Sequence, residues 1–548
     1  MADTQRRQPV AVKHFFDAVG SAAGTNKTVT SEAARAVLND GSITVPGAVQ
    51  ELLEKFKPEV HGMLLDSVQR GMADYKREHG FDADPSLVEF ALDTAIKTAT
   101  PLKDLNLPIR LDSATNSHHD QISLQPATAM VAIMAQLSEA IPFAAYLSAD
   151  VKTNEARLAI MDNKANSAFG DYAAGDSLNG IAGGGAYVMA ERVLTLTTNG
   201  GAGPFAVTAK ARTNDTGTAT PLLRGRTVIT VNGIPRARDI EGYGSGSNAI
   251  AGSVTIASTT YTLGGTVNTD TGALSITTSA ALPAGTVVKA MVYIDFEKAP
   301  AMAPEFGTEV NVFKLFAYAS RGIAKNTIDS MTQMQNELAL DPRGQALLSV
   351  RSQLAQERHY RAILKMLDVA KGQGAKAWNY DYTTQIAQKD RSQIWMNLLP
   401  ILAAASQEMA NDTVDHGITT LYFTGELAAQ LRGLSGPMFE TSGITDRPGI
   451  YRLGRLAGMY ECYYLPPGYG LVETGGGDTS QILAIGRATQ VARNPIILGD
   501  AVPAVFLPLA MGTDLVTQDG FYTRHFTELN PHEPSVKAAF IIDVTDIK

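Results

Sequence analysis

Residues 341–371, DPRGQALLSVRSQLAQERHYRAILKMLDVAK, carry the clearest structural signal in this chain. Asp341 is a favourable N-cap residue, and Pro342 suits the first turn of a helix because a missing N–H needs no partner there. The pattern predicts a helix from Pro342 to about Lys371. Thirty residues at 1.5 Å per residue span about 45 Å.

The apolar positions of this predicted helix leave a polar middle. Glu357, Arg358 and Arg361 interrupt the apolar pattern halfway along. A long helix of this kind is expected to lie across the face of a domain, with its middle open to solvent or to a partner. Its apolar positions are Leu347, Val350, Leu354, Ile363, Leu364 and Leu367.

The segments before this helix suggest an extended loop, a β-rich insertion and a returning strand. Polar residues and glycines over Asp150–Gly185 suit a long loop. Glu309–Ala319, EVNVFKLFAYA, is strand-like. Between them, residues 193–296 are dominated by Thr, Val, Ser and Gly, with alternating runs that end in glycine-containing turns. We therefore predict a small β-sandwich inserted into a parent domain.

The chain after the helix has the pattern of an α+β block. Helices are predicted over Ser392–Ala410 and Glu426–Leu434, with a strand over Thr419–Phe423 between them. A loop rich in glycine and proline follows at Ser435–Gly449. Near the end, Ala538–Val544 is apolar enough to be a central strand.

Residues 1–120 show helical periodicity. Apolar residues recur at intervals of three and four on either side of Pro58, which breaks the pattern. Asp84 and Pro85 begin a further predicted helix that ends at Thr98. Charged residues become rarer after residue 120, which marks a boundary there.

Composition excludes several classes of protein. The chain has 46 Lys and Arg against 55 Asp and Glu, a net charge of −9, whereas a nucleic-acid-binding surface needs clustered positive charge. The one cysteine, Cys462, excludes disulfide frameworks and cysteine-based zinc sites, and we expect it to be buried. No run of eighteen apolar residues and no signal peptide is found, so we expect no membrane span and synthesis in a cytosol.

Motifs for catalysis or cofactor binding are missing from the sequence. There is no Gly-Lys dipeptide of a P-loop, no GxGxxG, no GxSxG and no HExxH. We therefore expect no enzymatic activity, no cofactor and no metal.

Three polar or aromatic clusters remain, and each has a structural and a functional interpretation. His118, His119 and Asp120 fit an exposed linker better than a metal site. His525, Glu528, His532 and Glu533 fit a turn better than a cation site. Trp378 and Tyr380, on a predicted loop, could form a platform for a glycan or a partner, but a hydrophobic seam between subunits is the favoured interpretation.

The order of these blocks resembles the major capsid proteins of tailed bacteriophages, which have the HK97 fold. The resemblance covers about residues 120–548. It rests on the polar loop, the strand EVNVFKLFAYA, the helix after Asp341, the segment DHGITTLYFTGELAAQL (415–431) and the terminal strand KAAFIIDVT (537–545). It implies an α+β, HK97-like fold with an N-arm, an E-loop, a peripheral domain that contains a long spine helix, and an axial domain. The β-sandwich would be an insertion in the E-loop.

The resemblance also implies domain boundaries. They are a helical N-terminal arm or pro-segment (1–120), the end of the arm and first half of the E-loop (121–192), the inserted β-sandwich (193–296), the E-loop return and peripheral domain (297–390), the axial domain (391–490) and the return strands to the peripheral domain (491–548).

The function implied by the resemblance is that of a structural capsid protein, which self-assembles into the hexamers and pentamers of an icosahedral head. Such a shell encloses double-stranded DNA without reading its sequence, is made in the cytoplasm of a bacterial host and ends up in the virion. The main partner would be the chain itself, and further candidates are a scaffolding protein, a portal and a decoration protein.

Candidate interface residues lie on the spine helix, on the predicted aromatic loop and on the loop after the second axial helix. This last loop is the candidate for the five-fold or six-fold axis, because its glycines and prolines allow two curvatures. Two alternatives stay open: a phage tail or surface protein that binds glycan through the β-sandwich, and an enzyme that uses the His525–Glu533 cluster. The candidate interface residues are Arg351, Glu357, Arg358, Arg361, Trp378, Tyr380, Gly436, Pro437, Gly443 and Pro448.

Overall fold

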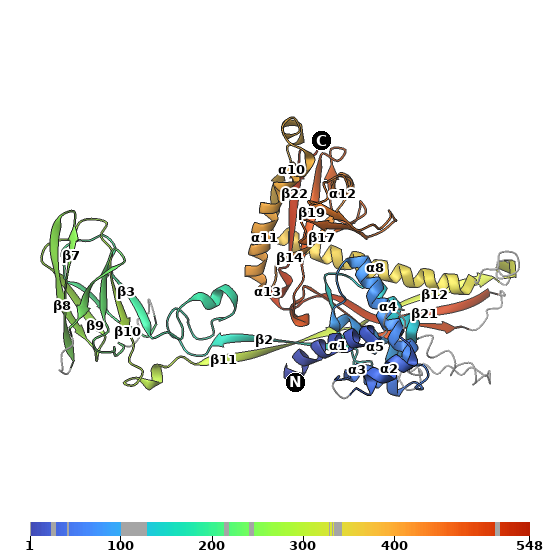
Figure 1. Cartoon of the computed structure of the whole chain (residues 1–548), viewed down its shortest axis with the longest axis horizontal. Coiled ribbons are helices and arrows are strands. Elements are labelled where there is room, and N and C mark those ends of the chain that lie inside the picture. The colour runs from blue at the N-terminus through green and yellow to red at the C-terminus, as the bar shows by residue number, and fades with distance from the viewer. Residues whose placement is uncertain are drawn as a thin grey trace. The chain divides into compact units, whose positions relative to one another are not determined.

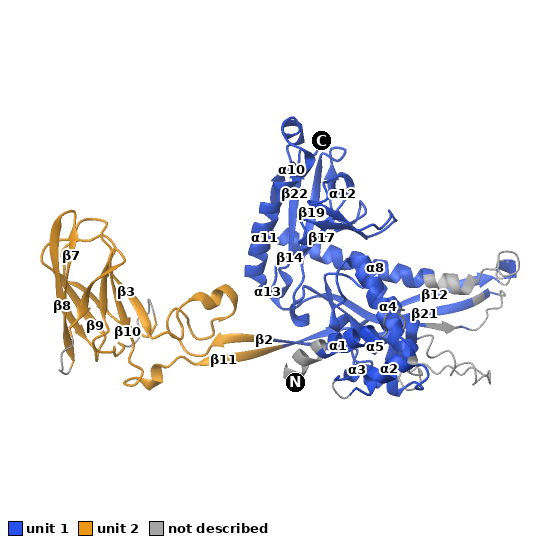
Figure 2. Ribbon diagram, viewed as in Figure 1, with its two compact units in different colours: residues 1–160, 312–548 blue, residues 161–311 orange. Residues whose placement is uncertain are grey.

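The computed structural model describes residues 2–22, 29–40, 43–99, 129–212, 219–240, 246–327, 329–330, 332–333, 342–509 and 516–548. The chain divides into two compact units (Figure 2). Unit 1 comprises Met1–Ile160 and Val312–Lys548, and unit 2 comprises Met161–Asn311. Because unit 1 is interrupted by unit 2, unit 2 is an insertion with both ends tied to the parent.

The α+β block of unit 1 is built on a sheet of order β13-β22-β19-β14-β17-β16-β15, with β18 paired to β19. The apolar strand predicted near the C-terminus is β22, which pairs with β19 and β13 inside the sheet. The strands are β13 Lys376–Asn379, β14 Ile418–Phe423, β15 Phe439–Thr441, β16 Tyr451–Leu456, β17 Tyr460–Tyr464, β18 Glu473–Thr474, β19 Thr479–Gly486 and β22 Ala539–Thr545. The helices are α9 Tyr382–Gln385, α10 Arg391–Met396, α11 Leu398–Thr413, α12 Gly425–Leu431 and α13 Glu533–Val536.

A second sheet of unit 1 has the order β1-β20-β21-β12 and lies along the long helix α8 (Figure 1). The helix α8 spans Pro342–Gln373, which confirms the helix predicted from Pro342 to about Lys371. Its predicted N-cap, Asp341, lies outside the described residues. The strands are β1 Ala144–Tyr146, β12 Tyr318–Thr327, β20 Ile496–Pro508 and β21 Val516–Leu529, and the short helix η4 Val491–Arg493 precedes β20.

The N-terminal residues fold into a helical block that shares the core of unit 1. Asp84 caps the predicted fifth helix, since its Oδ1 accepts a hydrogen bond from the backbone N–H of Ser86 at 2.9 Å. Buried residues of the block, such as Leu64 and Val68, belong to the same hydrophobic cluster as Ile363 of α8 and Ile541 of β22. The block therefore packs on its own chain. Its helices are α1 Ala2–Ala22, α2 Ser31–Leu38, α3 Gly47–Glu54, α4 His61–His79 and α5 Pro85–Ala99, and residues 129–138 are also helical.

Unit 2 contains one antiparallel sheet of eight strands, of order β3-β10-β5-β6-β7-β8-β9-β4. The inserted β-domain is present, but its strands form a single sheet instead of the two separate sheets expected of a sandwich. The edge strands β3 and β4 contact each other, so the sheet curls around its core of residues such as Ile276 and Val292. The strands are β3 Glu191–Thr197, β4 Phe205–Thr208, β5 Val228–Val231, β6 Ile234–Asp239, β7 Ser247–Ile256, β8 Thr259–Asn268, β9 Ala273–Thr278 and β10 Val288–Tyr293, with η2 Gly180–Gly184 and η3 Pro300–Met302 in the connections.

The strand predicted over Glu309–Ala319 is β11, Phe306–Phe316, and it pairs with β2, Glu155–Ala165, as a two-stranded ribbon. Ion pairs line this ribbon. Glu155 accepts from Arg157 at 2.9 Å and from Lys314 at 3.2 Å, and Lys164 pairs with Glu309. Charged pairs on a ribbon this narrow hold the register where few apolar contacts are available.

Candidate functional site

The four candidate residues on α8 fall into two groups. Arg351 and Arg358 form ion pairs inside the chain, with Glu139 at 3.4 Å and Asp500 at 3.0 Å. Glu357 and Arg361 are exposed, and Glu357 only accepts a hydrogen bond from Gln353 one turn earlier. The polar middle of α8 therefore has one side that anchors the helix to the second sheet and another that is open.

The anchoring side is a buried charged cluster. The Asp500 side chain is only 5% exposed and that of Arg358 is 14% exposed. His525 lies opposite Asp500 in the β20–β21 ladder, and burial together with the Arg358 guanidinium lowers its pKa to about 4. Burial also raises the pKa of Glu139, against the influence of Arg351. Buried charges of this kind fix the position of α8 because none of them can lose its partner cheaply.

The loop between α12 and β16 is mostly open to solvent. Gly436, Pro437, Gly443 and Pro448 are all exposed, while Met438 and Phe439 pack into the core of the α+β block. Gly443 has φ of +72°, a conformation that favours glycine. The segment predicted as a loop is therefore partly packed in its own chain, since it contains the strand β15 paired with β16, and its glycine and proline positions remain exposed.

One side of this loop is tied down. The guanidinium of Arg447 donates to both carboxylate oxygens of Glu78 on α4, at 3.1 and 2.7 Å. Arg432 of the α12 C-terminus pairs with Asp446. An open pocket of about 590 Å³ lies between α12 and the loop, lined in part by Ala428, Arg432 and Tyr451.

Trp378 and Tyr380 do not form a seam between subunits. They are 2% and 0% exposed within one chain, and Trp378 lies on β13, where it meets Trp395 edge to face at 5.3 Å. Because β13 pairs in parallel with β22, the aromatic side chains enter the core of the α+β block. The prediction that they lie at an interface is wrong, since a short strand was taken for a loop.

The His525–Glu533 cluster is dispersed. Glu528 accepts from Lys365 of α8 at 2.7 Å, the Nδ1 of His532 lies 2.8 Å from the hydroxyl of Ser535, and Glu533 pairs with Lys537 at 2.9 Å. Among the described residues, no group of three or more His, Cys, Asp or Glu is placed to hold a metal ion. His118, His119 and Asp120 lie outside that part of the chain.

Cys462 is buried on β17, as predicted. Burial raises the pKa of its thiol, with the neighbouring Glu461 carboxylate acting in the same direction. A thiol held protonated in this way is a poor nucleophile.

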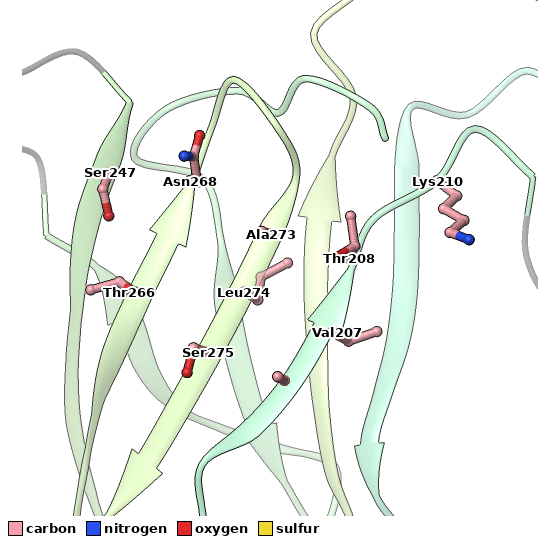
Figure 3. A pocket seen from close by; sticks show the side chains of 10 residues that line it. Val207, Thr208, Lys210, Ser247, Thr266, Asn268, Ala273, Leu274 and Ser275 are labelled. Carbon is pink, nitrogen blue, oxygen red and sulfur yellow. The ribbon is translucent and has the colours of Figure 1, made fainter. Parts of the chain in front are cut away.

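A shallow pocket of about 710 Å³ lies on the inserted sheet (Figure 3). Its lining includes Thr208, Ser247, Asn268 and Ser275, and none of the described residues that line it is aromatic. Sugar rings usually stack on aromatic faces, so this surface does not favour the glycan-binding alternative.

The sequence analysis missed an exposed apolar surface on β11 and β12. Val312 and Phe316 of β11 are 58% and 51% exposed, and Tyr318 and Ile323 of β12 are 63% and 61% exposed. The alternation in EVNVFKLFAYA indicated a strand with one apolar face, but it did not indicate that this face would be uncovered. In the part of the chain that the structure describes, no helix or strand covers these side chains.

None of the helices described is both long enough and apolar enough to cross a membrane.

Comparisons with known proteins find similarity at the level of structure. No family model and no curated protein matches the sequence. The chain is similar to a chain of the capsid of jumbo bacteriophage PhiKZ, with 10% identity, coverage of 74% of this chain and 91% of that one, and a TM-score of 0.38. It is also similar to a chain of Microbacterium phage Oxtober96, with 12% identity, 62% and 95% coverage and a TM-score of 0.30.

A third similar structure is the SrpI encapsulin complex of Synechococcus elongatus, with 11% identity, 44% and 79% coverage and a TM-score of 0.27. The mixed α and β character predicted in the sequence analysis is observed here, with the long helix α8, the β2–β11 ribbon, the α+β block and the inserted β-domain.

Proposed function

We propose that this chain is a major capsid protein, a structural subunit whose copies assemble into the hexamers and pentamers of an icosahedral phage head around double-stranded DNA. In this proposal α8 is the spine helix, the β1-β20-β21-β12 sheet belongs to the peripheral domain, and the β2–β11 ribbon is the E-loop. The part of the α+β block within residues 391–490 is the axial domain, and its exposed positions after α12 lie at the capsomer axis.

The observation that carries the proposal is the pair of uncovered apolar side chains Val312 and Phe316, which lie on the same side of β11. Burying a Val or Phe side chain stabilises by about 1.5–3 kcal/mol when the change from exposed to buried is complete. These side chains are already about half covered, so each contributes about 1 kcal/mol when a second copy covers it. Because a shell repeats every contact in each subunit, small energies of this kind add up to a stable assembly.

The proposal assigns no turnover to the chain. The one thiol is buried and protonated, the His525 cluster is dispersed, and Arg351, Arg358 and Lys365 of α8 are engaged in ion pairs. A scaffolding protein, a portal and a decoration protein are proposed as further partners in capsid assembly. The chain itself is proposed to be synthesised in the host cytoplasm and to end up in the virion.

The test is assembly of the purified full-length chain, followed by sedimentation velocity and negative-stain microscopy. We expect rings, sheets or closed shells that disappear in the double variant Val312→Ser/Phe316→Ser. Ile234→Ser is the matched control, because Ile234 is also an exposed aliphatic side chain at 52% but lies on β6 of the inserted sheet. A wild-type chain that stays a monomer at every concentration would refute the proposal, as would equal assembly by the double variant.

A further inference from the structure

A buried pair of side chains joins the N-terminal helical block to the α+β sheet. His79, the last residue of α4, is 7% exposed, and its Nδ1 lies 3.0 Å from the hydroxyl of Tyr463 on β17. Its ring also contacts Tyr75 of the same helix, with 4.4 Å between centroids. This contact is separated by 384 residues in sequence, so it is a tertiary bond between two parts of the chain.

A second pair of the same kind lies beside the first. His359 of α8 has its Nε2 3.3 Å from the hydroxyl of Tyr422 on β14. Tyr422 and Tyr463 face each other in the parallel β14–β17 ladder, and their rings stack at 5.4 Å. One pair holds the N-terminal block and the other holds the spine helix, and both use neighbouring positions on the same sheet.

Burial favours the neutral imidazole of His79 and lowers its pKa. A neutral ring can accept the hydrogen bond of the Tyr463 hydroxyl at Nδ1. A protonated ring has two N–H groups and cannot accept. Charging His79 therefore reverses this hydrogen bond, because Nδ1–H can then only donate to the Tyr463 oxygen, and it leaves the buried Tyr463 O–H without its acceptor beside a buried positive charge.

The charges that face His79 also oppose protonation. Arg452 of β16, Arg487 after β19 and Arg447 of the axial loop all place positive charge near the ring. The nearest carboxylates are already occupied, since Glu461 binds Arg452 at 2.6 Å and Asp84 binds Arg487 at 2.9 Å. Around His359 the facing groups are Tyr422, Phe143 and His79 itself. Among the described residues, no carboxylate is one of the groups that act most strongly on either histidine.

We propose that the His79–Tyr463 pair is an acid-sensitive latch that holds the N-terminal helical block on the sheet, that the neighbouring His359–Tyr422 pair holds the spine helix on the same sheet, and that protonation of each histidine weakens the attachment it makes. The latch lies within one chain, so this inference goes beyond the proposed shell function and holds whether or not the chain assembles. The chemical signal that operates it is the proton alone.

The sign and size of the pH dependence follow from the two folded-state values. Burial lowers the pKa of His79 and of His359 to about 3, from 6.5 in the exposed state. The docked state is therefore fully favoured above about pH 6.5, weakens as the pH falls below that value, and stops weakening below about pH 3. At about pH 5 each histidine shifts the equilibrium of its own attachment, the block for His79 and the spine helix for His359, about 30-fold toward release.

The test uses hydrogen exchange and mass spectrometry on the full-length chain between about pH 7.5 and pH 5, corrected for the intrinsic pH dependence of exchange. We expect protection of α4 to fall on acidification, while peptides of the inserted sheet keep theirs. Trp378 and Trp395, the only tryptophans, both lie in the core of the α+β block, so their fluorescence reports whether that core stays folded.

Two variants test the assignment to these histidines. His79→Gln keeps an amide acceptor and donor but does not titrate, and we expect it to remove about 30-fold of the acid response of α4. His359→Gln is the matched control, because its bond to Tyr422 joins α8 to β14 and does not involve the block, and it should leave most of the acid response of α4 in place. Tyr463→Phe, which removes the hydroxyl bonded to His79, serves if His79→Gln does not fold at neutral pH, and it should lower the protection of α4 at pH 7.5. The inference is overturned if α4 stays protected at pH 5 in the wild-type chain, if tryptophan fluorescence and α4 protection are lost together, if folded His79→Gln responds to acid as the wild type does, or if Tyr463→Phe leaves the protection of α4 unchanged.

Discussion

At the scale of single residues, burial decides roles that residue type leaves open. Trp378 and Tyr380 are of residue types that are common at interfaces, yet the structure places them in a hydrophobic core with Trp395. By contrast, Val312 and Phe316 look like ordinary strand residues and are left uncovered. Sequence alone distinguishes apolar from polar positions, but the partner that covers an apolar side chain depends on the tertiary fold.

The buried position of Trp378 can be tested in the folded monomer. Replacing Trp378 with alanine removes a buried aromatic side chain and leaves a cavity, so we expect a loss of about 3–5 kcal/mol in the free energy of unfolding. Urea denaturation followed by circular dichroism measures it. Tyr318→Ala is the control, because Tyr318 is exposed on β12 and its loss should change unfolding by less than about 0.5 kcal/mol. A small effect of Trp378→Ala would contradict the buried position of Trp378 and favour the interpretation that it lies at an interface.

At the scale of elements, the periodic segments were predictable and their partners were not. The helix α8 follows from Pro342 and the apolar positions after it, and α5 follows from Asp84 and Pro85. Nothing in the local pattern indicated that Arg358 would meet Asp500, which lies 142 residues later, or that His79 would meet Tyr463. Such pairs join distant segments, so neither spacing nor propensity reports them.

The two sides of α8 should respond differently to loss of charge. Asp500→Asn leaves the Arg358 guanidinium buried without its carboxylate, and we expect unfolding to become easier by about 3 kcal/mol. Arg361→Gln, on the exposed side of the same helix, should cost less than about 0.5 kcal/mol in the monomer. Urea midpoints of the two variants give the comparison. Equal effects would contradict the division of α8 into an anchoring side and an open side.

At the scale of the whole molecule, the chain consists of a parent unit and an insertion with separate cores. The β-rich texture of residues 193–296 was enough to predict the insertion, because alternating Thr and Val runs differ plainly from the helical segments on either side. The single curled sheet was not predictable, since strand order depends on pairings between β3 and β10 and between β4 and β9. Arg192 adds a local tie: its guanidinium lies 4.3 Å from the centre of the Phe169 ring and donates to the carbonyl of Met189 at 2.8 Å.

Because the two units have separate hydrophobic cores, we expect the inserted unit to have its own free energy of unfolding. A fragment of residues 161–311 should unfold cooperatively in urea, because all the residues of the sheet core and of the Phe169–Tyr187 cluster lie inside it. Ile276→Ala removes a fully buried side chain from that core and should cost about 2–5 kcal/mol, with the same value in the fragment and in the inserted unit of the full chain. Ile234→Ala, at an exposed position, should change neither. If the fragment is unfolded, or if the cost of Ile276→Ala differs between the two contexts, then the insertion depends on the parent unit for its stability, and the evidence for an autonomous domain fails.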